Sequence, residues 1–368
     1  MSNIDFKKLG DYVKIRTGKL DANASSEDGS YPFFTCSIEP LKISSYSYDC
    51  ECCLVAGNGD LNVKYYNGKF DAYQRTYIIE SLNKEKLDVM YLYFFLSSYI
   101  EVLRKQSIGG VIKYIKLGNL TDALIPIPPL GKQKEICRNL IQSQKVLTTN
   151  QKLLSKYDIL IKSRFIEMFG DNPIENGKWK VEKLGNLGLC KNGMNFSYED
   201  NGFEINCLGV GDFKDNAVIS NCEKLPVISL NEKPSEEYLL KDNDIVFVRS
   251  NGNKELVGRS VLVHPRVLTT FSGFCIRFRL STDSINHLFL LQFLKIPNTR
   301  KNMAGRGANI QNLNQQILLN LDIPVPQIEL QNDFATFVHQ IDKSKFAVQK
   351  SLEKAETLYK SLMQEYFG

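Results

Sequence analysis

The feature that most constrains this chain is an internal repeat. The segment Ile125-Pro126-Ile127-Pro128-Pro129-Leu130 recurs 198 residues later as Ile323-Pro324-Val325-Pro326-Gln327-Ile328. The same ungapped shift pairs Gln133 with Gln331, and it continues to Phe169-Gly170 and Phe367-Gly368. Self-similarity at one fixed spacing indicates a duplicated structural unit. We therefore expect two copies of one fold rather than a single continuous core.

Each copy divides into a globular part and a long helix. The globular part consists of short β-rich runs broken by Gly, Asn and Asp turns, followed by one helix. The shift is only 175 between Lys8-Leu9-Gly10 and Lys183-Leu184-Gly185, so we place extra residues of the second copy between Asp212 and Leu240. The predicted strands include 75–79, 244–248 and 274–278, and the predicted helices are 87–103 and 287–294.

The long helix of each copy has a seven-residue apolar period. In the first copy it is predicted from Gln133 to Phe169, a length of roughly 55 Å. Such a helix with one wide apolar stripe needs a partner, and a seven-residue repeat favours left-handed coiled-coil packing. The other copy is the natural partner, although pairing between two chains would give similar packing. The residues predicted to face the partner helix are Leu140, Leu147, Leu154, Ile161, Met168, Val338, Ile341, Val348, Leu352, Tyr359 and Leu362.

Connectivity sets the direction of this pairing. The first helix leaves the first globular part and reaches the second, and the second helix leaves the second part, so paired helices run antiparallel. The expected fold class is α+β, with two globular domains, each followed by a long helix, and an antiparallel coiled coil with pseudo-two-fold symmetry. The predicted domains are 1–130 and 172–328, with a central helix in 131–171 and a distal helix in 329–368.

Composition and charge exclude some classes of protein. A hydrophobic content of 43% with 24% charged residues is ordinary for a globular protein. No apolar run approaches the length of a membrane span, and the N-terminus lacks the apolar stretch of a signal peptide. The net charge of +5 is compatible with nucleic acid. It is uneven, because 132–167 holds eight Lys/Arg and three Asp/Glu whereas 329–365 holds five and six, but a solvated helix face also explains these counts.

The cysteines and histidines give no sign of a reactive centre. The nine cysteines are an odd number without framework spacing, and the cluster Cys50-Glu51-Cys52-Cys53 adjoins the apolar Leu54-Val55, far from any of the three histidines. We therefore predict buried free thiols, no metal site and a reducing cytoplasm. There is no glycine-rich phosphate loop, and Asn172-Pro173-Ile174-Glu175 lacks the second proline and the aromatic residue of an adenine-methyltransferase motif. We predict no catalytic residue in this chain.

The whole chain resembles the specificity subunit of a Type I restriction-modification system. The most specific marks are the two proline-rich segments before Gln133 and Gln331, each with a glycine-containing turn upstream, at Gly109-Gly110 and Gly305-Arg306-Gly307. The family has a glutamate before each glutamine, whereas Lys132 and Leu330 stand here. Further matching segments are Phe6-Lys7-Lys8-Leu9-Gly10-Asp11 with Arg16-Thr17-Gly18-Lys19, and Gly68-Lys69-Phe70-Asp71-Ala72 with Gln74-Arg75-Thr76.

The resemblance implies a non-catalytic, DNA-binding subunit. Each globular part would be a target-recognition domain that reads one half of a bipartite, gapped site in double-stranded DNA. The paired helices would set the spacer and dock two modification (methyltransferase) subunits, which methylate adenine, while restriction subunits would add ATP-driven translocation and endonuclease cleavage. S-adenosylmethionine, ATP and Mg would then bind to partner subunits, with no cofactor in this chain and no membrane partner.

Candidate DNA contacts are polar side chains on projecting turns, because such groups can reach base edges and phosphates. Arg249 and its neighbours are the best candidates, since they combine a bidentate donor with two amides on a Gly-bearing loop. A solvated turn is the alternative for every cluster. The candidates in the first domain are Arg16, Thr17, Lys19, Asn58, Lys64, Tyr66, Asn67 and Lys113; those in the second are Lys191, Asn192, Asn195, Arg249, Ser250, Asn251, Asn253, Lys254, Arg259, Arg306, Asn309 and Gln311.

Two other functions fit parts of the same pattern. A free-standing methyltransferase or nuclease with recognition modules would need the cofactor motif that the sequence lacks. A structural adaptor that does not bind DNA would retain the coiled coil. Salt-sensitive binding to random duplexes separates the adaptor from a DNA reader, because phosphate contacts release counterions.

Overall fold

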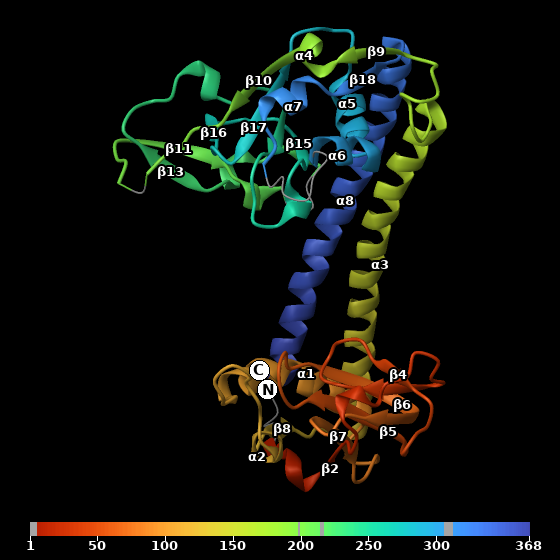
Figure 1. The fold of residues 1–368 in the computed structure, drawn as a ribbon. Helices are drawn as coiled ribbons and strands as arrows, with labels where there is room; N and C mark the ends of the chain where they lie inside the picture. The colour runs from red at the N-terminus through yellow and green to blue at the C-terminus, as the bar shows by residue number, and fades with distance from the viewer. Residues whose placement is uncertain (1–5, 198, 214–216, 305–311) are drawn as a thin grey trace. The chain divides into compact units, whose positions relative to one another are not determined.

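The computed structural model describes residues 6–197, 199–213, 217–304 and 312–368. The chain packs into two compact units (Figure 1). Unit 1 consists of Met1–Lys152 together with Val348–Gly368, and unit 2 consists of Leu153–Ala347. Each of the two longest helices begins in one unit and ends in the other, so that unit 1 is completed by the far end of the chain.

Unit 1 is built on one six-stranded sheet in the order β2-β7-β5-β6-β3-β4. Its longest contact joins β5 and β6 as an antiparallel pair from Tyr48↔Phe70 to Val55↔Val63. The stretch Cys52–Ala56 of β5 is completely buried because both of its faces are covered. The strands of this sheet are β2 (Val13–Thr17), β3 (Tyr31–Phe34), β4 (Leu41–Ile43), β5 (Tyr48–Ala56), β6 (Val63–Ala72) and β7 (Thr76–Ser81).

Helix α1 (Val89–Gln106) covers one face of this sheet. Its first turn is capped by the Asp88 carboxylate, which accepts hydrogen bonds from the backbone N–H groups of Met90 and Tyr91. Its apolar side packs with Cys53, Val55 and Ile79 into one core. The remaining elements of this unit are β1 (Phe6–Lys8), α2 (Leu117–Thr121) and β8 (Leu124–Pro126), and β1 pairs with β8.

Unit 2 splits its strands between two main sheets. A five-stranded sheet has the order β10-β17-β14-β15-β12, and a three-stranded sheet has the order β13-β11-β16. Strands β12 and β13 lie in the region that the repeat offset marked as longer. The elements are β9 (Lys180–Lys183), α4 (Leu184–Leu187), β10 (Gly188–Asn192), β11 (Phe203–Leu208), β12 (Val218–Ile219), β13 (Val227–Leu230), β14 (Asp244–Val248), β15 (Ser260–Val263), β16 (Thr269–Phe271), β17 (Cys275–Leu280), α5 (His287–Leu294), α6 (Pro297–Ala304), α7 (Gln315–Leu319) and β18 (Asp322–Val325).

The two long helices are α3 (Leu130–Phe169) and α8 (Ile328–Phe367), of 40 residues each. Inside unit 1 their contacts run antiparallel, since Asn139, Gln144 and Asn150 of α3 bond in that order to Tyr366, Tyr359 and Ser351 of α8. Inside unit 2 the direction is the same, with the Asp158–Lys345 ion pair followed by the Phe165–Phe334 ring contact. The predicted α+β class, with each globular part followed by a long helix, is confirmed.

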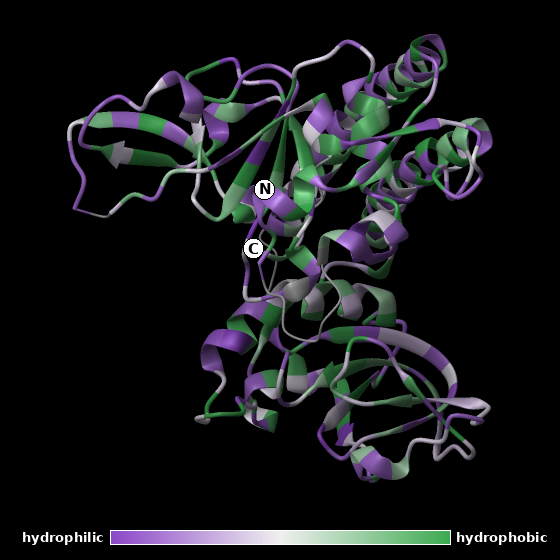
Figure 2. Cartoon of the chain, turned by 45° about the horizontal axis from the view of Figure 1, so that its top comes forward, coloured by the Kyte–Doolittle hydropathy of each residue, from purple (hydrophilic) through white to green (hydrophobic). Residues whose placement is uncertain are grey.

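All eleven residues predicted to face the partner helix are buried or half-buried. Leu140, Ile161, Val338 and Leu352 are the most enclosed of them. Val146, which directly precedes Leu147 on α3, is 47% exposed. Hydrophobic stretches are frequent in the strands and helices, where they alternate with hydrophilic residues (Figure 2).

The cysteines follow the sequence-based expectation in large part. All nine are free thiols, and Cys52 and Cys53 are buried within β5, while Cys50 is half-buried. Across the residues that the structure describes, no cluster of three or more His, Cys, Asp or Glu side chains could hold a metal ion. In the same residues, no helix combines the length and the apolar content that crossing a membrane requires.

Candidate nucleic-acid interface

A buried glutamine locks the start of each long helix to the globular part of the same copy. In unit 1, Gln133 is completely buried. Its Oε1 accepts a hydrogen bond from the Asp88 N–H at 2.9 Å, and its Nε2 donates to the carbonyls of Lys86 and Pro128, each at 2.8 Å. The side chain thereby joins the first turn of α3, the strand end before it and the start of α1. We call this arrangement the glutamine clamp.

The same clamp recurs in unit 2. Gln331 is completely buried. Its Oε1 accepts from the Asn286 N–H at 2.8 Å, and its Nε2 donates to the carbonyls of Ser284 at 3.1 Å and Pro326 at 2.7 Å. Every partner lies 198 residues after its counterpart in unit 1. Sequence comparison aligned the two glutamines but assigned them no role, although a polar residue repeated at the start of an apolar-faced helix was an available signal.

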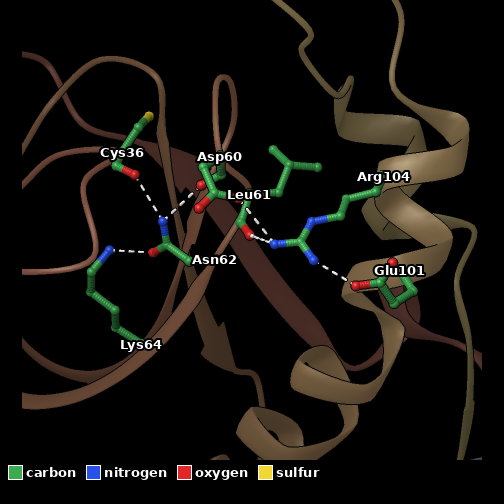
Figure 3. Close-up of polar contacts among 7 residues, drawn as sticks. All are labelled: Cys36, Asp60, Leu61, Asn62, Lys64, Glu101 and Arg104. Atoms are coloured by element: carbon green, nitrogen blue, oxygen red, sulfur yellow. Dashed lines mark hydrogen bonds and ion pairs between the residues drawn. The ribbon is translucent and has the colours of Figure 1, made fainter. Parts of the chain in front are cut away.

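In unit 1, a turn after β5 is held rigidly from two sides (Figure 3). Asn62 donates to the carbonyls of Cys36 at 2.8 Å and Asp60 at 2.9 Å. From α1, Arg104 donates to the Asp60 carboxylate at 3.0 Å and to the Leu61 carbonyl at 3.1 Å. The turn of residues 57–62 is therefore fixed both to the strand side and to the helix side of unit 1.

Two sequence-predicted contacts meet at this turn. The Gly59 N–H donates to the Lys113 carbonyl at 2.9 Å, and the backbones of Asn58 and Tyr114 form an isolated antiparallel β-bridge. The loop that carries Lys113 is thus bound to the turn that carries Asn58. Lys64 is close in sequence and donates from Nζ to Oδ1 of Asn62, while burial lowers the pKa of its amine. Lys64 therefore supports the turn as well as contributing charge.

Arg16 is engaged inside unit 1. Its guanidinium donates to Glu80 at 2.6 Å and lies over the Tyr48 ring at 4.9 Å. Cys50 faces the same group, and its thiol pKa is lowered mainly by a hydrogen bond with Cys52. Thr17 is exposed at the end of β2, and its carbonyl accepts from the Tyr48 hydroxyl at 3.2 Å. Lys19 is exposed just beyond.

Tyr66 and Asn67 lie on β6 directly before Gly68. Gly68 has a φ of +138°, a conformation that L side chains rarely adopt. Tyr66 is half-buried, its ring packs 5.0 Å from that of Phe34, and its hydroxyl donates to the Lys69 carbonyl at 3.3 Å. Asn67 is exposed beside Gly68. The structure links neither of them to the turn at Asn58.

In unit 2, the predicted contacts Asn195 and Arg249 gather around the turn between β16 and β17. Arg249 donates from Nη1 to the Gly273 carbonyl at 3.2 Å, and its own N–H bonds the Phe274 carbonyl at 2.8 Å. Asn195 packs so closely on Gly273 that a Cβ there would lie 2.0 Å from its Oδ1. Phe274 is 62% exposed at the tip of this turn. Sequence reasoning missed Phe274, because an apolar residue at the edge of a predicted strand is normally assigned to the core.

Lys191 and Asn192 stand at the end of β10. The Lys191 amine pairs with Glu237 at 2.7 Å and lies 4.5 Å over the Tyr238 ring, and the hydrogen bond to Glu237 raises its pKa. Asn192 has a buried Oδ1 that finds no hydrogen-bond partner among the described residues. In the paired strand β17, burial lowers the pKa of the Arg277 guanidinium, and its buried Nε likewise has no described partner.

The remaining candidate DNA contacts of unit 2 differ in the contacts that they make. Ser250 forms a bridge with Asn312, and Asn251 and Asn253 stabilise their own turn by accepting from the N–H groups two residues ahead. Arg259 is half-buried and interacts with a neighbouring group. The Lys254 side chain and the residues Arg306, Asn309 and Gln311 lie outside the described residues.

Unit 2 also contains a cavity of about 610 Å³. Its wall combines α3 and α8 residues such as Phe165 and Val338 with residues of α5 and the segment after it. Lys295 lines the cavity, and burial lowers the pKa of its amine to about 8. Burial also raises the pKa of the nearby Asp342 carboxyl. The turn at Gly273 does not line this cavity.

These features define a tandem α+β protein. Each of its two similar units holds the start of a long helix through a buried glutamine, and each carries its own polar turn. The chain belongs to the Type I restriction modification DNA specificity domain family, which matches residues 1–156 and 176–356. It is similar to the specificity subunit of the Escherichia coli enzyme EcoDI, with 41% identity over 139 residues. That match covers 37% of this chain and 31% of the relative, less than a third of its length.

Other relatives extend over more of the chain. The Methanocaldococcus jannaschii MjaVIII specificity subunit is 23% identical over 97% of this chain and 90% of its own length. Among solved structures, the Type I S subunit from M. genitalium has a TM-score of 0.67 at 16% identity, covering 100% of this chain and 97% of that one. A chain from a structure of type I complex assembly has a TM-score of 0.55 at 16% identity, covering 99% and 97%. These structures establish the fold.

Proposed function

We propose that this chain is the DNA-reading subunit of a Type I restriction-modification complex, and that each unit reads one half of a bipartite, gapped site. The observation that carries the proposal is a contrast: the attachment of the long helix is the same in both units, whereas the side chains on the polar turns differ. The glutamine clamp repeats with all its partners. The turns after β5 and β14 occupy equivalent places in their sheets, since β5 pairs with β6 and β7 as β14 pairs with β15 and β17, but they carry different side chains, with Asn58 in unit 1 and Arg249 in unit 2. Such a contrast suits two readers of different sequences mounted in the same way.

The chemistry of the two turns supports contact with DNA. Lys113 is exposed beside Asn58, so unit 1 offers a cation and an amide at one place. Arg249 with Asn195 gives unit 2 a guanidinium and an amide around Gly273. Arginine and asparagine are the side chains that bond guanine and adenine edges, and lysine suits phosphates. We assign Arg249 to a base edge and Lys113 to a phosphate.

We further propose that the long helices dock two modification subunits, which bind S-adenosylmethionine and methylate adenine, and that restriction subunits carrying ATP and Mg join them in the cytoplasm. Exposed apolar side chains on both helices support this. In unit 2 these include Ile159 and Leu160 on α3 and Phe346 on α8, of which Phe346 is 72% exposed. An aromatic side chain left in water on a helix suits a protein interface.

The first test is the methylation pattern of host DNA. We expect a two-part adenine motif with a fixed gap, which disappears when the gene for this chain is deleted. Single-molecule sequencing of native DNA measures both. A contiguous motif, or a gapped motif that survives the deletion, would refute the proposal. The purified chain alone should methylate nothing, and methylation by the chain without other subunits would favour the free-standing enzyme.

The second test concerns the spacer. Seven residues inserted after Lys152 and after Ala347 lengthen both helices by about 10 Å, or about three base pairs of duplex. We expect the methylated gap to lengthen by that amount while both half-sequences stay unchanged. A changed half-sequence, or an unchanged gap with full activity, contradicts the spacer role.

The third test concerns docking. The Phe346→Ser substitution should weaken co-purification with the modification subunit by about tenfold or more, as expected for a central aromatic anchor. Val227→Ser is the matched control, because Val227 is 58% exposed on β13 of the same unit. Equal loss in both variants would mean that exposed apolar residues act non-specifically.

A further inference from the structure

The loop of residues 108–114 in unit 1 exposes apolar side chains without a local structural reason. Val111 is 103% exposed and Ile112 is 62% exposed, which makes them the tip of the loop. Among the described residues of unit 1, none covers Val111, and Ile112 is covered only in part. Single exposed apolar residues are common on protein surfaces, but two adjacent aliphatic side chains at the tip of a projecting loop form a contact surface.

The loop is rigid at its base. Ile108 and Tyr114 exchange two backbone hydrogen bonds, of 3.0 and 2.9 Å, which close it. Gly109 has a φ of +117°, and a Cβ at this position would lie 2.5 Å from the Ile112 carbonyl oxygen, so the tight path requires glycine. The closed loop is then bound to the turn at Gly57 and Gly59, which Asn62 and Arg104 hold in place (Figure 3).

The surroundings of the tip are positively charged. Lys105, Lys113 and Lys116 are all exposed, and among the described residues no ion pair involves any of them. The segment 104–116 contains no Asp or Glu. An apolar tip with lysines around it is complementary to a duplex, in which apolar base stacks lie inside two rows of phosphates. A neutral or basic protein surface would be a poorer partner for the same charges.

We propose that this loop is a wedge, in which Val111 and Ile112 insert at one base-pair step of the duplex bound by unit 1 and unstack it, while the three lysines hold the adjacent phosphates. The inference rests on the proposed DNA-reading function and adds a mechanism to it. Aliphatic wedges of this kind open a base step and bend DNA. Pyrimidine–purine steps unstack most easily, so the unit 1 half-site contains such a step at the position of the wedge.

The experiment uses the full chain assembled with the modification subunits of its host and the duplex found by methylation mapping. 2-Aminopurine is placed at successive positions of the unit 1 half-site, because its fluorescence rises when a base loses its stacking neighbour. Wild-type protein should raise the fluorescence at one step only. The V111S/I112S variant should lose that rise and bind the cognate duplex about 10- to 100-fold more weakly, with the salt dependence of binding unchanged because the lysines remain.

Two matched variants separate the wedge from other roles. Leu82→Ser removes an apolar side chain that is 61% exposed elsewhere in unit 1, and it should leave both affinity and fluorescence unchanged. Lys113→Ala should reduce the salt slope by about one while the fluorescence rise remains. Because Val111 and Ile112 make no core contacts, the melting temperature should be the same in all variants.

Specific binding by V111S/I112S with the fluorescence rise intact would overturn the wedge and leave the DNA-reading function in place. Wild-type binding without any rise in fluorescence would overturn it in the same way. Normal DNA binding by the variant combined with loss of the modification subunits would show that the tip docks protein instead. Absence of sequence-specific binding by the wild-type complex would refute the proposed function itself.

Discussion

Unit 1 and unit 2 attach their long helices in the same way, but the outer parts of their sheets differ. Both hold the start of a long helix by a buried glutamine, and both pair the strand before that helix with the first strand of the unit, as β1 with β8 and β9 with β18. The central strand order is the same, as β2-β7-β5-β6 and β10-β17-β14-β15, whereas the remaining strands differ, because unit 1 has six strands in one sheet and unit 2 divides eight strands between two. The comparison teaches that the attachment of the helix and the central strand order are constrained, while the outer strands and the side chains on the turn after β5 or β14 are free to change.

The two units also differ in how they hold charge. In unit 2, Asp244 is completely buried and receives two hydrogen bonds of 2.7 Å from Arg279, with a third from the Lys241 N–H. In unit 1, the pair of Arg16 and Glu80 on β2 and β7 keeps part of both side chains in solvent. Removing one partner of a buried ion pair strongly lowers the free energy of unfolding, whereas an exposed ion pair contributes little to it.

The largest effect is expected from breaking the glutamine clamp. Gln133→Leu leaves two buried carbonyls and one N–H without partners and should lower the stability of unit 1 by about 3 to 6 kcal/mol, and Gln331→Leu should do the same in unit 2. Hydrogen exchange of each unit measures the loss. The exposed residues Gln142 and Gln340 provide matched Gln→Leu controls, which should change little. Unequal losses of stability in the two units would mean that the two glutamine clamps are not equivalent.

The buried and the exposed charge pairs give the next prediction. Asp244→Asn should destabilise unit 2 by about 3 kcal/mol, because it leaves the Arg279 guanidinium without its counter-charge. Glu80→Gln in unit 1 should cost about 1 kcal/mol or less. The exchange rates of amides in β14 and in β7 report the two effects. Equal losses would show that the difference in burial has no energetic consequence.

Arg249 tests whether the two reading surfaces are independent. Arg249→Ala should weaken binding by about 10- to 100-fold, through a change confined to one half-site. Competition among duplexes with single base changes in each half measures this. Arg266→Ala is the control, since Arg266 is an exposed arginine of the same unit. A uniform loss over all sequences would assign Arg249 to a phosphate instead.

The smallest effect concerns Lys295, which lines the unit 2 cavity. Burial lowers the pKa of its amine from 10.5 to about 8, so the folded unit disfavours the proton that the unfolded chain retains. At pH 7 the amine is protonated in both states and the folded state bears the full cost, which disappears as the pH rises from about 8 past 10.5. Lys295→Met should therefore stabilise unit 2 by about 1 kcal/mol at pH 7, after allowance for solvent screening.

The gain from Lys295→Met should shrink as the pH is raised above 8, and thermal unfolding at pH 7 and at pH 9.5 measures the difference. The exposed Lys343 provides the control for loss of a positive charge on α8. A gain that is independent of pH would come from packing of the methionine rather than from the amine.

Much of the fold could be predicted because its strongest signals are local or repeated. The strand predicted at 244–248 is β14 and the helix predicted at 287–294 is α5. Both could be predicted because an apolar run and a capped apolar helix are recognisable from a few neighbouring residues. The strand order of the sheets could not be predicted, because pairs such as Leu124 with Lys8 join residues far apart in sequence. Such pairing depends on packing rather than on local pattern.

The candidate site was less predictable for a related reason. Sequence reasoning selected polar residues on turns, and the structure brings Asn58 to Lys113 and Asn195 to Arg249. It could not show that Arg16 is engaged with Glu80, because that contact joins two strands. It overlooked Val111 and Phe274, since apolar residues are assigned to the core unless their exposure is known. The DNA contacts themselves remain predictions.

The way α8 completes unit 1 has a consequence for biosynthesis. Leu362 and Phe367 pack on the core of unit 1, where Phe367 lies 5.2 Å from the ring of Tyr91. At about 5 to 20 residues per second, a ribosome needs on the order of 10 to 40 seconds to make the intervening stretch. Throughout that time the nascent N-terminal half waits with an uncovered patch on α1. Translation speed and chaperone access thus bear on unit 1 more than on unit 2, which closes on itself once Ala347 has emerged.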